Sequence, residues 1–389
     1  MRTRAKQRLR EFRAPGETAA EQRAWDVVRS AYLEREPARG RTGIRARFAL
    51  APILAVLGAG LLLSPAGATV AKLITKALGV RHAAPMLSSL PSPGRVLLSG
   101  PGGTWTAAAD GSTRHLGAWP QASWSPHALF VAVWTGDRLA AVDPHGNVRW
   151  AIARPRISDA TWFSPSGYRV AYLSSGSVRV IAGDGTGDHL LARDVASVAP
   201  AWRPGHPYQL AYVTDRGSVV VRDGDTGQAL FSTAPGSRPR QLLWSSDGSR
   251  LVVIGAHLVR TYAAGGRPRA WLSLPRGESA TDAALSPDGD TLALVLDQRQ
   301  VVVASTTSDA PRIRQLLPGA GLRDVSWSPD GRWLLVSWPA ANQWVFLRVT
   351  GSPHMTAVSR IAQQFSNGGS RRSFPQLEGW CCTAQGSGG

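Results

Sequence analysis

Cysteine is almost absent from this chain of 389 residues, and the two that occur, Cys381 and Cys382, are adjacent. An adjacent pair cannot build a disulfide framework, and no spacing of Cys and His predicts a zinc site. Lysine is scarce as well, since it occurs only at positions 6, 72 and 76, so Arg carries almost all of the net charge of +18.

Motifs that carry enzymatic chemistry are also absent. The sequence has no Gly-x-Ser-x-Gly nucleophile turn, no His-Glu-x-x-His pair, no Walker loop and no Gly-x-Gly-x-x-Gly after a predicted strand. Its eight histidines are scattered, mostly in or beside turns, and no Asp-rich turn has the order of an EF-hand. We therefore expect no catalytic residue, no metal and no cofactor.

Positive charge is densest at the N-terminus. Residues 1–47 contain 13 Lys or Arg against 6 acidic residues, and Thr18 and Glu21 form a capping box for a helix to about Arg35. The helix either lies on a membrane surface or docks a cytoplasmic partner. The basic residues directly precede an uncharged run, where a topology signal explains them better than nucleic-acid binding does.

The uncharged run begins at Phe48. Extended to Ala68 it would span about 31 Å as a helix, which is enough to cross a bilayer. The arginines before it predict a signal anchor at 48–68, with residues 1–47 in the cytoplasm and the rest of the chain outside. Ala66-Gly67-Ala68 also fits a signal-peptidase site, so a cleaved, secreted protein is the alternative. Residues 69–93 read as an amphipathic helix to Gly79 and a linker.

The rest of the chain repeats one unit. In its clearest copy, Val325 to Val336, one strand ends at Trp327, a turn covers Ser328-Pro-Asp-Gly331, and the next strand starts at Trp333. Aligning the equivalent turn positions gives steps of 39, 39, 42, 41 and 42 residues, for Pro126, Pro165, Pro204, Ser246, Pro287 and Pro329. A four-stranded propeller blade has this period.

The first blade lacks a strand at its start. Residues 95–99, 104–108 and 113–116 read as three strands, and Phe374–Cys382 offers the missing one, with Trp380 at the repeat's Trp position. We therefore predict an all-β propeller over residues 94–382, with seven four-stranded blades closed by the C-terminal strand and a disordered tail at 383–389. Six or eight blades are the alternatives.

The Trp-Ser-Pro-Asp-Gly units resemble the repeats of TolB-like and WD40-like bacterial propellers over roughly residues 95–382. The resemblance implies an interaction platform and nothing narrower. Together with the predicted anchor and the missing catalytic motifs, it leads us to expect a membrane-anchored, extracytoplasmic propeller that binds a protein or ligand without catalysis. The alternative is a propeller enzyme of lactonase, lyase or glycan hydrolase type with an axial active site. Asp223-Gly-Asp-Thr-Gly227 also resembles a quinoprotein repeat, but a single copy does not predict a quinone cofactor.

Arginines gather on one predicted face. In a propeller, the loops that enter each blade and those that join second to third strands share one face. Seven arginines in these loops form the candidate site for an unknown protein or anionic ligand: Arg154, Arg156, Arg193, Arg238, Arg240, Arg276 and Arg323. Acidic residues in the same loops favour the alternative of solvated loops that pair with themselves.

Two smaller features complete the predictions. Asp159, Asp282 and Asp324 each lie three residues before the Trp or Leu that ends a unit's first strand, which indicates a repeated structural hydrogen bond in the loop entering the blade. The pair Cys381-Cys382 fits buried apolar packing, a vicinal disulfide, an intermolecular link or a lipid-modified site.

Overall fold

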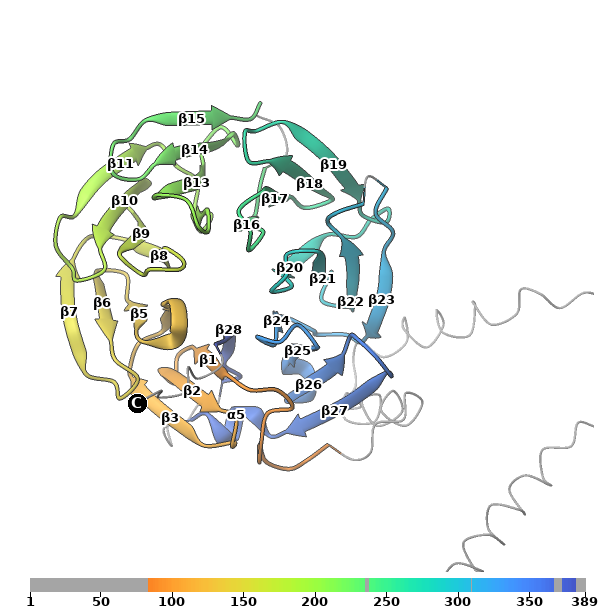
Figure 1. Ribbon diagram of the computed structural model, residues 1–389. Coiled ribbons are helices and arrows are strands. Elements are labelled where there is room, and N and C mark those ends of the chain that lie inside the picture. Colours follow the sequence, from red (N-terminus) through yellow and green to blue (C-terminus); the bar gives the residue numbers. More distant parts are fainter. Residues whose placement is uncertain (1–82, 235–237, 309, 367–372, 383–389) are drawn as a thin grey trace, which may run out of the picture. The chain divides into compact units, whose positions relative to one another are not determined.

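Seven four-stranded antiparallel sheets form a closed ring in the computed structural model (Figure 1), which describes residues 83–234, 238–308, 310–366 and 373–382. The predicted all-β propeller with seven blades is confirmed. The expected helices at 18–35, 48–68 and 69–79 and the tail at 383–389 lie outside the described residues. Within the described ranges, no helix has the length and apolar character needed to cross a membrane.

We number the blades in the order in which they follow round the ring and list the strands of each from the axis outward. The first three are β28 (Gln376–Cys381), β1 (Arg95–Ser99), β2 (Thr104–Ala108) and β3 (Thr113–Gly117); β4 (Gln121–Trp124), β5 (Val131–Trp134), β6 (Arg138–Val142) and β7 (Val148–Ala153); and β8 (Ile157–Trp162), β9 (Arg169–Ser174), β10 (Ser177–Ala182) and β11 (His189–Arg193).

The fourth and fifth blades are β12 (Ala201–Trp202), β13 (Gln209–Val213), β14 (Val219–Asp223) and β15 (Ala229–Ser232), then β16 (Gln241–Trp244), β17 (Arg250–Ile254), β18 (Leu258–Ala263) and β19 (Pro268–Ser273). The sixth and seventh are β20 (Ala280–Leu285), β21 (Thr291–Leu296), β22 (Gln300–Ser305) and β23 (Arg314–Pro318), then β24 (Val325–Trp327), β25 (Trp333–Trp338), β26 (Gln343–Arg348) and β27 (His354–Ser359). The described helical turns are η1 (Pro126–Ala128), η2 (Pro339–Ala341) and α5 (Ile361–Gln364).

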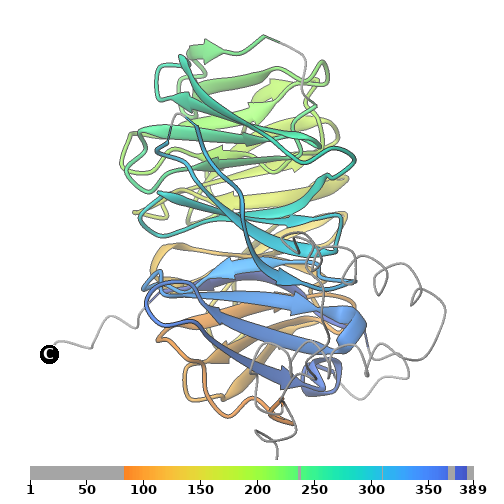
Figure 2. The ribbon, with the colours of Figure 1, turned by 90° about the vertical axis from the view of Figure 1, so that its right-hand side faces the viewer.

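The hydrophobic core is divided between the blades. Buried apolar side chains form seven clusters, and each cluster lies between two neighbouring blades. Figure 2, which views the ring from its edge, shows the sheets stacked face to face. Because successive side chains of a strand point to opposite faces, a strand covered on both faces must be apolar throughout, which explains runs such as Leu292–Leu296.

In three units the tryptophan at the end of the inner strand is hydrogen-bonded to the blade before it. The indole nitrogen of Trp327 donates to the carbonyl oxygen of Ala284 in the sixth blade at 3.0 Å, and that of Trp202 donates to Thr161 at 3.1 Å. In the same way Trp124 reaches Gly379 of the first blade at 3.4 Å. In these three units the indole thus links neighbouring inner strands.

The C-terminal strand closes the ring as predicted. Strand β28 pairs with β1, and Trp380 is opposite Val96 just as Trp327 is opposite Leu334 in the seventh blade. Each inner strand contacts the inner strands of both neighbouring blades, and the strands on either side of β28 are β24 and β4. The seven inner strands therefore follow one another around the axis without a gap.

Residues before the first strand differ from the expected linker. Ala84 pairs with Val358 at the outer edge of β27, and Leu87 and Leu90 are buried in the core between the seventh and first blades. The backbone nitrogen of Leu87 donates to the side chain of Gln364 in α5 at 2.9 Å. The two leucines stand among small and polar residues, and their burial attaches the segment to the closure of the ring.

The serine of the repeated turn also stabilises the turn, a role that the sequence analysis gave only to the Pro, Asp and Gly. Ser328 is fully buried; its hydroxyl donates to Asp330 at 2.5 Å and accepts the backbone nitrogen of Trp333 at 2.9 Å. Ser245 makes the same pair of bonds with Asp247 and Arg250. The serine therefore fixes the start of the second strand against the turn.

Candidate functional site

The topology gives the ring two functionally different faces. Every blade is an antiparallel meander, so the connection into each inner strand and the turn between second and third strands lie at one end, which we call the arginine face. The turns after the inner strand and after the third strand lie at the other end, which we call the turn face. All seven predicted site arginines lie at the arginine face, six of them in its connections and Arg193 as the last residue of β11.

The guanidinium of Arg154 is already engaged in an ion-pair network around Asp188. Its guanidinium donates to Asp188, which also accepts Arg179 at 2.9 Å and the hydroxyl of Tyr172 at 2.7 Å. Burial and the bond to Asp188 raise the pKa of Tyr172 to about 12. Burial works against ionisation of Asp188, but bonds from Arg179, Tyr172 and Arg154 hold its pKa below the usual range. Arg154 therefore connects the second and third blades.

Arg323 and Arg240 also have structural partners. Arg323 pairs with Asp324 at 3.0 Å and donates to the carbonyl oxygen of Pro375 at 2.5 Å, close to the closing strand. Arg240 donates to the carbonyl oxygen of Ala280 in the next blade at 3.2 Å. These bonds hold neighbouring blades together.

The other four arginines are exposed and have no carboxylate partner among the described residues. Arg156 makes one long hydrogen bond, at 3.3 Å, to the hydroxyl of Ser175, while Arg193, Arg238 and Arg276 make no side-chain bond within the described ranges. Three of the four, Arg156, Arg193 and Arg238, follow one another in, or directly before, the connections into the third, fourth and fifth blades. An exposed guanidinium keeps all its donors available to an anion.

A group of carboxylates occupies the inner strands near the same face. Burial raises the pKa of Asp159 on β8 to about 6, and burial together with nearby Asp324 raises that of Asp282 on β20 to about 7. For Glu378 on β28, burial raises the pKa to about 7 against the bond from Ser99, with Asp324, Asp159 and Asp282 adding to the rise. The charges of this group therefore repel one another.

Two of the three aspartates, Asp282 and Asp324, make structural hydrogen bonds of the predicted kind. Asp282 accepts the backbone nitrogen of Val325 at 2.8 Å, and Asp324 accepts that of Leu377 at 3.2 Å, so each reaches the next blade. Asp159 accepts no hydrogen bond from the described residues. Asp159 and Asp282 lie within inner strands, not in the loops before them, because the strands begin earlier than the sequence indicated.

Glu378 was missed by the sequence analysis. A β-bulge between Leu97 and Leu98 in the pairing of β1 with β28 gives Glu378 no partner in the register. The one available signal was an acid two residues before Trp380 in a short apolar segment. Within the described ranges, no group of three or more His, Cys, Asp or Glu side chains is arranged to hold a metal ion.

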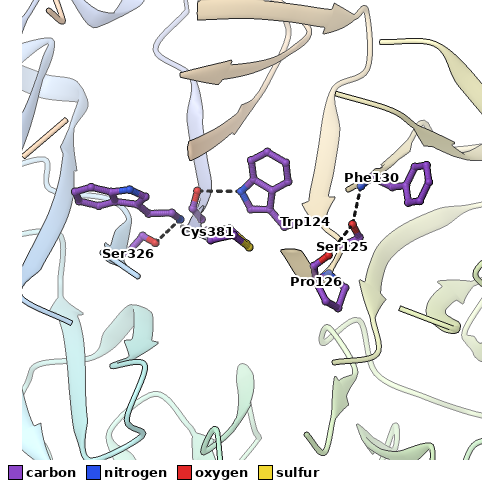
Figure 3. The surroundings of a disulfide bond; sticks show 9 residues. Trp124, Ser125, Pro126, Phe130, Ser326 and Cys381 are labelled. Atoms are coloured by element: carbon purple, nitrogen blue, oxygen red, sulfur yellow. Dashed lines mark hydrogen bonds between the residues drawn. A yellow bond between two sulfur atoms is a disulfide. The ribbon is translucent and has the colours of Figure 1, made fainter. Parts of the chain in front are cut away.

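The two cysteines are bonded to each other in the structure. The disulfide of Cys381 and Cys382 stands at the end of β28, on the turn face, and both residues are partly exposed. Figure 3 shows Trp124, Ser125 and Pro126 of the second blade beside it. Of the alternatives that the sequence left open, this geometry is the vicinal disulfide.

Comparison with known proteins identifies the fold alone. No protein-family model and no curated protein matches the sequence. A solved chain from the crystal structure of the mitotic checkpoint complex aligns with a TM-score of 0.55 at 18% identity, over 70% of this chain and 92% of its own. Hsv2 of Kluyveromyces lactis aligns with a TM-score of 0.55 at 12% identity, over 69% and 96%. The predicted WD40-like repeat is confirmed at the level of fold, and the TolB-like relationship and the membrane anchor stay predictions.

Proposed function

We propose that this chain is a membrane-anchored propeller outside the cytoplasm that binds an anionic partner on its arginine face and catalyses no reaction. Support for the binding role comes from the closed ring, which holds many loops rigidly on one face. Support for the anchor comes from the sequence at 48–68 and the arginines that precede it.

The observation that carries the binding site is the set of exposed arginines without carboxylate partners: Arg156, Arg193, Arg238 and Arg276. Surface charges that are already paired contribute little to binding, whereas unpaired guanidinium groups on a rigid frame attract and orient carboxylates or phosphates. Arg154, Arg240 and Arg323 belong to the structural frame of this site.

The test is charge reversal of the four exposed arginines to Glu, with poly-glutamate and dextran sulfate as anionic probes. The matched control reverses Arg267, Arg269, Arg312 and Arg314, which are also exposed but lie away from the arginine face. Both variants change the net charge equally. We expect the site variant to lose at least about tenfold in affinity, since each lost charge-assisted bond costs about 1.5–3 kcal/mol, and the control to lose less. Equal losses in both variants would show that binding follows net charge and not this site.

A second candidate, a propeller enzyme with an axial site, is favoured by one observation. Asp282 and Glu378 have pKa values near 7, in the range that a general acid or base needs. Against it, both carboxylates already accept hydrogen bonds within the ring, from Val325 and Ser99. An enzyme of this kind would lose turnover of its substrate in Asp282→Asn or Glu378→Gln while keeping probe binding at the arginine face.

A further inference from the structure

One interface between blades differs from its neighbours on the turn face. A cleft of about 790 Å³ lies between the second and third blades, and its lining includes Phe130, Trp150, Trp162 and Tyr168. The ring of Phe130 is stacked against that of Trp162, with centroids 6.4 Å apart, and forms the floor. Volumes of this size are typical of ligand sites.

At two other interfaces an arginine at the corresponding position reaches the next blade, whereas the fourth, sixth and seventh blades have Gln209, Thr291 and Trp333 there. Phe130, Arg169 and Arg250 are equivalent, because each accepts at its carbonyl oxygen the backbone nitrogen of the residue just after the inner strand. Arg169 reaches Asp225 of the fourth blade through two bonds at 2.8 and 2.9 Å, and Arg250 reaches Asp290 of the sixth blade at 2.7 Å.

The interface between the fourth and fifth blades is closed as well, by Arg203, which donates to the carbonyl oxygen of Gly248 at 2.7 Å. A phenylalanine makes no such bond. The cleft between the second and third blades lies at the interface where Phe130 occupies this position.

The turn that borders the cleft departs from the repeat in the same copy. His127 and Ala128 stand where the seventh blade has Asp330 and Gly331, and both have positive φ, 62° and 53°. Side chains other than Gly seldom adopt this conformation, which is retained mainly at functional sites. The strained turn holds Leu129 with 60% of its surface exposed, and Tyr168 faces the cleft from the third blade with 65% exposed.

The charges at the rim of the cleft favour an acidic partner. Arg149 has 58% of its side chain exposed and uses only one nitrogen, Nη2, in its bond to Asp143, so Nε and Nη1 have no bond to a described residue. Arg169, also in the lining, is fully engaged with Asp225. Asp184 accepts both the backbone nitrogen and the hydroxyl of Thr186. Arg149 is thus a cation with free donors beside apolar side chains, while the exposed carboxylate of Asp184 lies elsewhere in the lining.

We propose that this cleft binds a segment of a partner protein in which a Trp, Phe or Leu side chain fills the space over Phe130 and a neighbouring carboxylate pairs with Arg149. Exposed apolar side chains beside an open cleft with a polar rim mark protein-binding sites. Residues 383–389, Thr-Ala-Gln-Gly-Ser-Gly-Gly, contain no Trp, Phe or Leu and no acidic residue. The site is separate from the arginine face and independent of the proposed function.

The test measures fluorescence anisotropy with three labelled peptides: Gly-Ser-Glu-Trp-Leu-Ser-Gly, the same peptide with Lys for Glu, and the same peptide with Ala-Ala for Trp-Leu. We expect the first to bind the full chain at least tenfold more tightly than the other two. Leu129→Ser and Tyr168→Ser, both at exposed positions that leave the core intact, should each reduce that binding, and Phe130→Arg should abolish it by placing a charge where the apolar side chain would lie. Leu230→Ser, at a position 44% exposed on β15, is the matched control and should bind as the wild type does.

Several outcomes would overturn the proposal. These are equal binding of the three peptides, no binding at about 1 mM peptide, or unchanged binding by both Leu129→Ser and Tyr168→Ser. A chain ending at Cys382 that binds the first peptide tenfold more tightly than the full chain would instead make the tail the occupant. Reversal of the four arginines on the arginine face should leave peptide binding unchanged, so failure of one site is distinguishable from failure of the other.

Discussion

The carboxylate of Asp324 in the seventh blade accepts a hydrogen bond at 3.2 Å from the backbone nitrogen of Leu377, which lies 53 residues later in the strand that completes the first blade. The hydroxyl of Ser326 accepts the backbone nitrogen of Trp380 at 2.8 Å beside it. The two ends of the repeat are thus joined through side chains of the last blade as well as through the pairing of β28 with β1.

The first prediction concerns truncation before Phe374. Loss of β28 removes the inner strand of the first blade together with Leu377 and Trp380, and it exposes the apolar side chains that these two cover between the seventh and first blades. We expect the melting temperature to fall by roughly 10 °C, as the loss of several kcal/mol requires in a domain of this size. Truncation after Cys382 is the control and should change melting little. Identical melting of the two truncations would contradict closure by β28.

Asp324→Ala tests the side-chain link itself. Its carboxylate also accepts the hydroxyl of Ser337 at 2.7 Å and is 9% exposed, so the substitution leaves buried donors without a partner. We expect unfolding free energy to fall by about 2–4 kcal/mol, measured by urea titration. Asp215→Ala, at an exposed acid of the same face, should change it by less than about 0.5 kcal/mol. A similar loss in both variants would mean that net charge, not the link, sets stability.

The carboxylates near the axis predict a pH dependence. Folding raises the pKa values of Asp159, Asp282 and Glu378 to about 6, 7 and 7, so their protonated forms are favoured in the folded state. Their stabilising contribution is present below about pH 4, where the unfolded groups are also protonated, and is lost as pH rises through about 7. Arg323, Asp324 and Ser99 are the groups that face them.

The substitution Asp282→Asn tests whether this carboxylate contributes to the pH dependence of stability. The amide oxygen keeps the bond from Val325 and cannot ionise, so we expect the decline in urea midpoint between pH 4.5 and 7.5 to be shallower than in the wild type. Asp247→Asn, at a turn acid whose pKa is lowered mainly by its bond from Ser245, should leave the slope in that window unchanged. A wild-type midpoint that rises with pH over this window would contradict the assignment.

The buried serine of the repeated turn, Ser328, should contribute to stability. Ser328→Ala removes the acceptor of the Trp333 nitrogen and the donor to Asp330. We expect a loss of about 1–3 kcal/mol in unfolding free energy, because a buried backbone donor is left without a partner. Ser112→Ala, at an exposed serine that also bonds an Asp two residues away, is the matched control and should cost less than about 0.5 kcal/mol.

The fold could be predicted from the sequence because its signals are local and repeated. A turn such as Ser328–Gly331 identifies itself by residue type, and six copies at a steady spacing determine the blade. Closure followed from a strand missing at the start of the array and an additional strand at its end, where Trp380 matched the position that the repeat assigns to Trp. The number of blades then follows from the count of strands.

The site was less predictable, because pairing between blades depends on contacts that sequence spacing does not report. Arg154 and Asp188 are 34 positions apart, and nothing in either loop shows that they meet. Arg156 lies in the same loop as Arg154 but has no carboxylate partner among the described residues. In the sequence, the one sign of the cleft between the second and third blades is Ala128, which stands where the repeated turn has Gly. This departure could be interpreted only from the positions of Arg169 and Arg250 in the structure.

Thiol labelling of intact cells tests whether the propeller lies outside the cytoplasm. Because Cys381 and Cys382 are the only cysteines and are bonded to each other, a membrane-impermeant maleimide should label the protein only after an impermeant reductant. In a chain with both cysteines changed to Ser, Ser352→Cys on an exposed turn should label without reductant, and Thr3→Cys should label only after permeabilisation. Labelling of Ser352→Cys only in permeabilised cells would place the propeller in the cytoplasm and contradict the account.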